Sequence, residues 1–237
     1  MAKSPSRWQK PGWRFLRRLV LWPLLAVIAY WVLALALYRT VLPPATPLMI
    51  IRSIAAKDLV SYRPTPLTDI NNNLTKAVIA SEDARFCLHN GIDFNAVSDA
   101  LEDYEQRGRL RGASTITMQV SRNIFLWNGG GAFRKILEVP LALLLDAVWS
   151  KRRIIEVYLN IAEWGDGTFG AEAAARRYFQ KSAKNLTAAE ASRLTAILPN
   201  PIRWNAARPT RYIQSRSTII QRRISQLNKS QISCINP

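Results

Sequence analysis

The sequence predicts a mainly α-helical protein, with one membrane-spanning helix near its start and a single domain after it. An uncharged apolar run extends from Leu19 to Tyr38, and apolar residues in the remainder recur every three or four positions. No alternating strand pattern of any length accompanies them. A chain of 237 residues with 49% apolar residues has room for one sizeable core plus a small appendage.

The apolar run is long enough to cross a membrane. Residues 19–38 would span a hydrocarbon core of about 30 Å at about 1.5 Å per helical residue. Residues 1–18 hold only basic charges, which predicts a cytoplasmic tail and a domain on the outer face of a cell membrane. The alternative is a cleavable signal peptide, since Ala34 to Ala36 resemble a cleavage site, but the run exceeds the usual length of about 7 to 15 residues.

The net charge of +17 predicts anionic partners. Nucleic acid, phospholipid and phosphorylated substrates all fit that charge. A domain outside the cytoplasm favours membrane lipids and gives no role to nucleic acid. A DNA-binding protein remains an alternative only if the chain stays in the cytoplasm.

The cysteine and histidine content argues against a metal centre. Cys87 and Cys234 match neither a disulfide framework nor a zinc cluster, and His89 is the single histidine. The two cysteines are therefore expected to be a chance pair of thiols.

Proline spacing predicts a linker over residues 39–66, with one short helix or strand inside it, and a domain over residues 67–237. A first helix should lead into Glu82. Asp93 should cap a second helix that ends at Gly108. The residues that repeat at three- and four-residue spacing along that second helix are Phe94, Val97, Leu101 and Tyr104.

Four further helices follow from their spacing and caps. One begins at about Ala132 and contains Pro140, which should kink it. Ser150 caps the next helix, Thr187 and Glu190 form a capping box, and a last helix starts at about Thr210. The residues expected to face inward from the first of these helices are Ile136, Val139, Leu143, Leu144 and Ala147.

Several kinds of chemistry lack their motifs. There is no P-loop, no Gly-x-Gly-x-x-Gly after a strand, and no Ser-x-x-Lys or Lys-Thr-Gly. A Ser-His-Asp catalytic triad would have to use the single histidine, His89, which makes that interpretation strained. The type of chemistry that the sequence still allows is catalysis by a carboxylate, assisted by cations.

Glu82 is the candidate base, because it ends a helix beside Asp83, Arg85 and His89. A carboxylate within about 3 Å of a sugar hydroxyl can act as a general base, contributing about 10²- to 10⁴-fold. The alternative is an acidic pair exposed to solvent at a helix end.

A cluster of hydroxyls and cations follows. Ser114, Thr115 and Thr117 open a helix, where free N–H groups attract phosphate, although a simple N-cap would use the same residues. Arg122, Arg134 and Lys135 suit a departing pyrophosphate, and Glu138 lies one turn further on. A solvated basic face is the alternative for Arg134 and Lys135.

Three ordered motifs match a known family. Glu-Asp-x-x-Phe-x-x-His-x-Gly is met by Glu82, Asp83, Phe86, His89 and Gly91; Gly-x-Ser-Thr-Ile-Thr-Gln-Gln by Gly112 to Thr117 and Gln119; and Arg-Lys-x-x-Glu by Arg134, Lys135 and Glu138. With these motifs the chain resembles the monofunctional peptidoglycan glycosyltransferases that polymerise lipid II. The likeness runs from about Leu67 to Asn205.

The resemblance implies a lysozyme-like α fold with a membrane-dipping lobe. It implies β-1,4 polymerisation of lipid II, with release of undecaprenyl pyrophosphate. Glu82 would be the general base and Glu138 the second catalytic acidic residue. The implied substrate-binding residues are Asp83, Phe86, His89, Gly112, Ser114, Thr115, Thr117, Gln119, Arg122, Arg134 and Lys135.

The resemblance also implies partners and cofactors. The partners are lipid II, the lipid-linked glycan chain, membrane lipids, and other cell-wall synthesis or division proteins. No cofactor is required, and a divalent cation, Mg²⁺ or Mn²⁺, is an optional addition.

Two other functions stay open at this point. A lysozyme-like lytic enzyme would also use a glutamate, but it would not need the hydroxyl cluster or the Arg134-Lys135 motif. A catalytically weakened, membrane-anchored protein that binds precursors or acts as a scaffold is favoured only by Met118, where the family has glutamine, and by Gly130, where many members have arginine.

Overall fold

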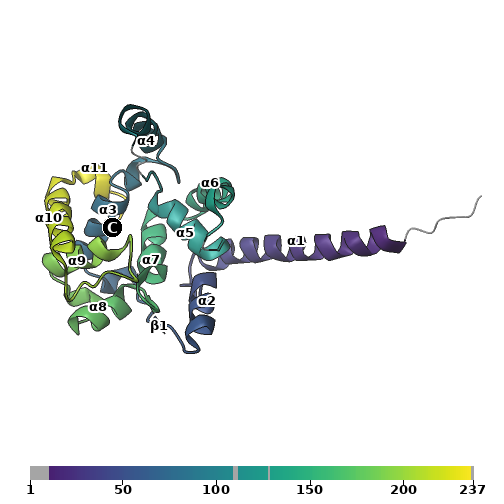
Figure 1. Cartoon of the computed structure of the whole chain (residues 1–237), viewed down its shortest axis with the longest axis horizontal. Helices are drawn as coiled ribbons and strands as arrows, with labels where there is room; N and C mark the ends of the chain where they lie inside the picture. Colours follow the sequence, from purple (N-terminus) through teal and green to yellow (C-terminus); the bar gives the residue numbers. More distant parts are fainter. Residues whose placement is uncertain (1–10, 109–111, 128, 236–237) are drawn as a thin grey trace, which may run out of the picture. The chain divides into compact units, whose positions relative to one another are not determined.

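The computed structural model describes residues 11–108, 112–127 and 129–235 (Figure 1). The chain divides into two compact units, and the boundary in the sequence lies between Thr40 and Val41. The first unit contains α1, Pro11–Leu37. Its stretch Arg17–Leu37 is long and apolar enough to cross a membrane by length and composition. The predicted apolar run therefore forms one continuous helix.

The second unit begins inside the predicted linker. Helix α2, Pro47–Ala56, starts at Thr46, whose hydroxyl accepts a hydrogen bond from the Met49 N–H at 3.3 Å. The side chain of Met49 is buried. Strand β1, Ser61–Tyr62, follows, and the Tyr62 hydroxyl donates to the Pro43 carbonyl at 2.7 Å. The segment holds both a helix and a strand, and both belong to the folded domain.

A small sheet of order β1-β3-β2 joins this segment to the middle of the chain. Strands β2, Glu163–Gly165, and β3, Thr168–Phe169, are antiparallel, whereas β1 and β3 are parallel. Gly167 adopts a φ of 62° in the connection Asp166-Gly167, a dipeptide typical of tight hairpins. The sequence analysis missed these strands because two or three residues are too few for a visible alternation.

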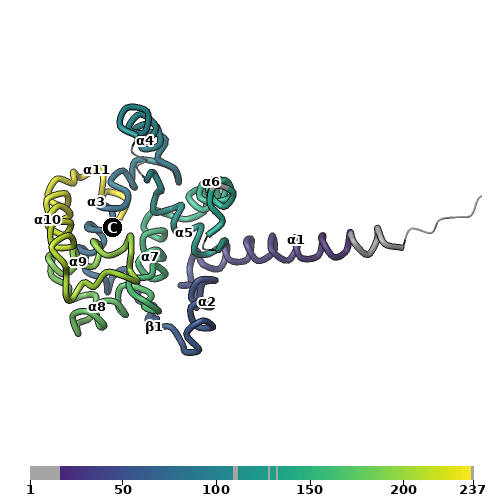
Figure 2. Tube along the Cα trace, in the orientation of Figure 1, coloured from purple at the N-terminus to yellow at the C-terminus, as the bar shows by residue number. Residues whose placement is uncertain are grey.

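Helices form most of the second unit (Figure 2). Helix α3 packs against α9 and α10, and α5 packs against α6 and α7. The bounds are α3 Asn72–Glu82, α4 Phe94–Arg107, α5 Ile116–Phe125, α6 Gly131–Val148, α7 Lys151–Ile161, α8 Ala171–Phe179, α9 Ala188–Ile197, α10 Arg211–Gln226 and α11 Lys229–Ile232, with 3-10 turns η1 Leu67–Asp69, η2 Phe86–Leu88 and η3 Ala183–Asn185.

The predicted helix ends are confirmed. Asp93 caps α4 through the Ala96 N–H, and Gly108 ends α4 with a φ of 62°. Ser150 caps α7, and Thr187 with Glu190 forms the capping box of α9. Caps are local sequence features, so they need no tertiary information.

The prediction of which side chains face inward from α6 was wrong. The predicted residues Ile136, Val139, Leu143, Leu144 and Ala147 are exposed, whereas Leu141, Ala142 and Leu145 are buried. Every residue of α6 from Val139 to Leu145 is apolar, so periodicity could not identify its inner face.

Helix α4 exposes most of its apolar repeat. Phe94, Leu101 and Tyr104 are exposed, and Ala100 is the buried residue of that helix.

A disulfide joins Cys87 in η2 to Cys234 just after α11. The expectation of a chance pair of thiols was therefore wrong. The two residues are 147 positions apart in sequence, so no local pattern could reveal that α11 packs on η2. The bridge ties the end of the described chain to the segment that follows Glu82.

Candidate functional site

Glu82 lies at the last position of α3, half-buried, with both carboxylate oxygens hydrogen-bonded. Ser81 Oγ donates to one oxygen and Gln119 Nε2 donates to the other, each at 3.3 Å. Burial raises the pKa of Glu82 above its usual 4.5, and the bond from Gln119 and the charge of Arg216 partly offset that rise. The carboxylate is thus held in a poorly solvated setting.

Tyr158 of α7 holds Gln119 in place. Its hydroxyl donates to Gln119 Oε1 at 3.2 Å, which leaves the amide N–H group of Gln119 directed at Glu82. Burial raises the pKa of Tyr158 well above its usual value, so its hydroxyl remains a donor. A chain of three side chains therefore orients the Glu82 carboxylate.

Asp83 joins the end of α3 to the start of α5. His89 Nε2 lies 3.0 and 3.1 Å from its two oxygens, and the Ile116 N–H donates to it at 3.0 Å. Asp83 and His89 are both nearly buried at the side chain, with 2% and 8% exposed. This network fixes the peptide next to Glu82 and gives Asp83 a structural role.

The start of α5 is locked against the Gly91 turn. Thr115 Oγ donates to the Gly91 carbonyl at 2.6 Å and accepts from the Met118 N–H at 3.1 Å. Gly91 has a φ of 78°, and a Cβ there would lie 2.8 Å from the Ala142 carbonyl oxygen. Only glycine fits at this position, which explains why the first motif has glycine there.

A cavity of about 430 Å³ opens beside Glu82. It is lined by α3 and the residues after it, the start of α4, the loop before α5, and one face of α10. Of the predicted site residues it brings together Glu82, Asp83, Gly112, Ser114 and Thr115. The charged lining residues that the sequence analysis did not assign to the site are Arg85, Asp93, Asp99, Arg216 and Arg223.

Most charges in the cavity wall are already paired. Arg85 Nε lies 2.7 Å from Asp93 Oδ2, and Arg85 Nη2 lies 3.5 Å from Asp99 Oδ2. The guanidinium of Arg85 holds the pKa of Asp93 below its usual value, against the effect of burial. Arg216 and Arg223 have no carboxylate partner among the residues that the structure describes.

The predicted cations lie outside this cavity wall. The Nε atom of Arg122 is buried and has no hydrogen-bond partner in the described part of the chain. Burial lowers the pKa of Arg122, but a guanidinium stays charged. Burial lowers the pKa of Arg134 as well, and the charge of Arg122 lowers it further. The two cations therefore lie near each other.

The third motif sits on the first turns of α6. Arg134 forms an ion pair with Glu138 and donates to the Gly129 carbonyl. Glu138 is buried, whereas Lys135 is exposed. Gly130 has a φ of 80°, which L side chains rarely adopt. Glu138 therefore positions Arg134 at the glycine loop.

Two predicted contact residues have no exposed surface. Phe86 and Thr117 are fully buried, Phe86 beneath the Lys151 ammonium and Thr117 near Asp146. Their placement supports packing roles. The sequence analysis did not predict Arg216 as a site residue, because it lies far from Glu82 in the sequence. The packing of α10 against α3 brings the two residues close together.

The residues that could hold a metal ion are Asp83, His89 and Asp93, with ligand atoms within 4.8 Å of one another. Their oxygens already accept from His89, the Ile116 N–H, Arg85 and the Ala96 N–H. A divalent ion would have to displace Arg85 or bind in place of the His89 contact. The donor set therefore fits a hydrogen-bonded anchor better than a metal site.

Comparison with known proteins places this geometry in a family. Residues 51–225 match the family model described as Transglycosylase. The chain is 50% identical to the biosynthetic peptidoglycan transglycosylase of Rhodospirillum centenum, with 94% of this chain and 96% of that protein covered. For the protein of the same name from Caulobacter vibrioides, identity is 45% and coverage 86% and 89%. The Pseudomonas putida protein of that name is 44% identical, with 90% and 91% covered. With its mainly helical, lysozyme-like domain and a motif-bearing cavity, the chain belongs to the transglycosylase family.

Proposed function

We propose that this protein polymerises lipid II into β-1,4-linked glycan strands of peptidoglycan and releases undecaprenyl pyrophosphate. The peptidoglycan transglycosylase activity follows from the family and from the names of its relatives. The observation that carries the finer proposal is Glu82, a half-buried, hydrogen-bonded carboxylate that lines a cavity. Arg216 and Arg223 lie in the same wall, and neither has an ion-pair partner among the described residues.

Glu82 acts as the general base in this proposal. It takes the proton of the acceptor's 4-hydroxyl as that oxygen attacks the anomeric carbon of the lipid-linked donor. The O4–C1 bond forms while the bond from C1 to the pyrophosphate oxygen breaks, with inversion. Burial raises the pKa of Glu82 toward the working range of a base, and Gln119 keeps the carboxylate oriented.

Arg122 and Arg134 stabilise the departing pyrophosphate. An unpaired, buried guanidinium Nε on Arg122 is a donor that lacks an acceptor within the described residues, and phosphate oxygens would supply one. Arg134 is held by Glu138 so that its charge stays at the glycine loop. Lys135, exposed beside it, adds a third cation. These groups would neutralise charge that grows in the transition state.

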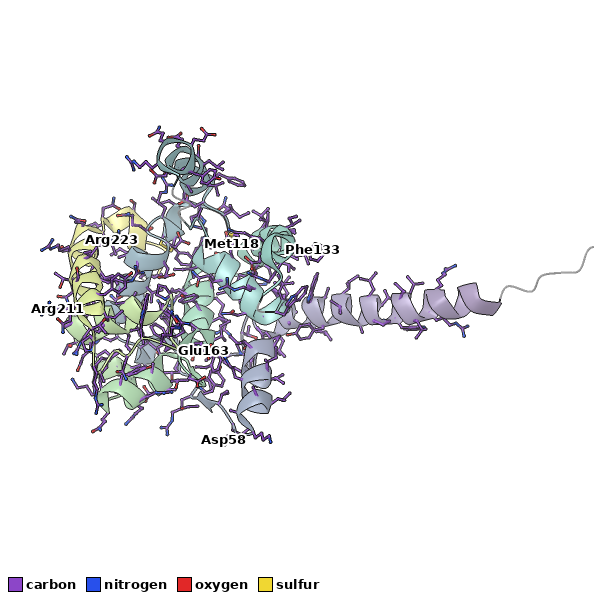
Figure 3. All side chains as sticks on the ribbon, in the orientation of Figure 1. Asp58, Met118, Phe133, Glu163, Arg211 and Arg223 are labelled. Carbon is purple, nitrogen blue, oxygen red and sulfur yellow. A yellow bond between two sulfur atoms is a disulfide. The ribbon has the colours of Figure 1, made fainter. Side chains whose placement is uncertain are left out.

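Membrane contact brings the enzyme to its lipid-linked substrate. Helix α1 is the anchor, and the exposed apolar faces of α4 and α6 are the lipid-facing surface of the domain. Phe133 lies on α6 (Figure 3) with 65% of its surface exposed. The Cys87–Cys234 disulfide supports an outer-face location, because disulfides persist in oxidising compartments.

One observation favours a second candidate, a lytic enzyme. A raised pKa of Glu82 also suits a general acid that protonates a glycosidic oxygen. Such an enzyme would cleave finished glycan, and it would gain nothing from the Arg122 and Arg134 cations.

The polymerase and the lytic enzyme can be distinguished by the substrate that each converts. The purified full chain is incubated in detergent with lipid II, and in parallel with finished glycan strands. We expect polymer and released lipid pyrophosphate from lipid II, and no fragments from glycan. Fragments from glycan together with no polymer from lipid II would replace the polymerase by the lytic enzyme.

A further inference from the structure

A second cavity adjoins the one beside Glu82. Its volume is about 300 Å³, and it is lined by Ala80, Ala84, Arg223, Gln226, Leu227 and Gln231. Three of these residues, Ala80, Ala84 and Arg223, also line the Glu82 cavity. The two cavities therefore adjoin along α10, with Arg223 in the wall of both, and we call the pair the path along α10.

Two cations of α10, Arg216 and Arg223, line this path, which also holds the carboxylates of Glu82 and Asp83. Arg216 and Arg223 are seven residues apart, two helical turns, so they share one face of α10. The Nε atom of Arg216 is buried with no hydrogen-bond partner in the described ranges, and its charge acts on Glu82. Arg223 is exposed and has no carboxylate partner among those same residues. Within the described part of the chain, neither guanidinium group forms an ion pair.

The wall beyond Arg223 has the chemistry of a peptide-binding surface. Gln226 and Gln231 carry neutral amides, and Leu227 supplies an apolar contact. Gln231 is fixed, since its Nε2 donates to the Ala84 carbonyl at 2.9 Å and the disulfide holds the following residues on η2. Among the residues that the structure describes, no acidic side chain lines this second cavity. A pyrophosphate would leave the amides and Leu227 without a role, whereas a peptide with free carboxylates would use all of them.

We propose that Arg216 and Arg223 form a subsite for a carboxylate of the peptide carried by lipid II, and that this peptide runs from the Glu82 cavity into the adjoining one. The inference rests on the proposed function, because it takes lipid II as the substrate. Guanidinium groups bind carboxylates through two parallel N–H donors. The subsite would select precursors by their peptide and hold the acceptor sugar at Glu82.

The subsite is tested by substituting Arg223. Arg216 is unsuitable, because its charge also affects the pKa of Glu82. Arg223→Gln is compared with Arg222→Gln, an exposed neighbour on α10 that lines neither cavity. Both full-length variants polymerise three substrates: lipid II with free peptide carboxylates, lipid II with those carboxylates amidated, and the lipid-linked disaccharide pyrophosphate without peptide. We expect Arg223→Gln to raise KM about tenfold for the first substrate only, with kcat within about twofold. Arg222→Gln should match the wild type throughout, and Arg223→Lys should recover part of the loss.

Two results would overturn the subsite. An equal rise in KM with the peptide-free substrate would show that Arg223 binds the pyrophosphate. An unchanged KM with all three substrates would show that Arg223 binds no part of the substrate. Failure of the wild type to polymerise any of the three would instead refute the proposed function, so the two failures are distinct.

Discussion

At the scale of single residues, the site is a set of fixed hydrogen bonds around one carboxylate. Gln119 and Ser81 hold Glu82, Tyr158 holds Gln119, and Asp83 ties the adjacent peptide to α5. Burial raises the pKa of Glu82, and the bond from Gln119 lowers it. Burial and this hydrogen bond therefore act in opposite directions on the pKa of the proposed base.

That balance predicts a pH dependence. A general base works only when ionised, so kcat/KM should fall as pH drops through the pKa of Glu82. Gln119→Met removes the donor that favours the ionised form, which raises that pKa further. We expect the acidic limb of the pH–rate profile to move to higher pH. A profile that keeps its acidic limb in place would contradict the role of Gln119.

The sequence predicted Glu82, Asp83 and His89 because they lie within eight positions and share one turn. It could not predict Tyr158, Arg216 or Arg223 as parts of the site. Those residues reach it only through the packing of α7 on α5 and of α10 on α3. Contiguous motifs point to the proposed base, and tertiary contacts show which residues surround it.

At the scale of elements, the helix ends followed from sequence but the buried faces did not. Caps such as Asp93, Ser150 and Thr187 act within one turn, so local rules suffice. For α4 and α6, periodicity marks an apolar face without saying whether protein or lipid covers it. Exposed Phe133 and Ile136 on α6 belong to the surface that we propose faces lipid.

The exposed face of α6 can be tested by adding charge. Ile136→Asp should lower polymerisation of lipid II in vesicles several-fold, because a carboxylate resists entry into the membrane. It should leave thermal stability nearly unchanged, since Ile136 is 69% exposed.

Ile219→Asp is the matched control, an exposed isoleucine on α10. It should leave activity in vesicles intact. Equal losses from both variants would mean that the effect of Ile136→Asp does not come from a lipid-facing surface.

At the scale of the whole molecule, the disulfide joins regions that lie far apart in sequence. Cys234 N–H donates to Cys87 Sγ at 3.3 Å, and Arg152 donates to the Ile235 carbonyl at 2.6 Å. The segment after α10 is thereby held on η2, next to the first motif. A sequence separation of 147 residues hides this link from any local pattern.

Reduction should therefore destabilise the domain. Closing so long a loop restricts the unfolded chain, and we expect a loss of about 2 to 5 kcal/mol in the free energy of unfolding when the bridge is reduced. Denaturant unfolding with and without reductant measures it. The double variant Cys87→Ser, Cys234→Ser should unfold like the reduced wild type and ignore reductant. A wild type that unfolds identically in both conditions would show that the bridge adds no stability.

The most direct test of the central claim is lipid II polymerisation by Glu82→Gln beside the wild type and Glu105→Gln. The glutamine keeps the shape of Glu82 and loses the base, whereas Glu105 is an exposed carboxylate of α4 outside the cavity. We expect Glu82→Gln to lower kcat by about 10²-fold or more, while Glu105→Gln stays at the wild-type rate. Wild-type turnover by a correctly folded Glu82→Gln would contradict the assignment of Glu82 as the general base.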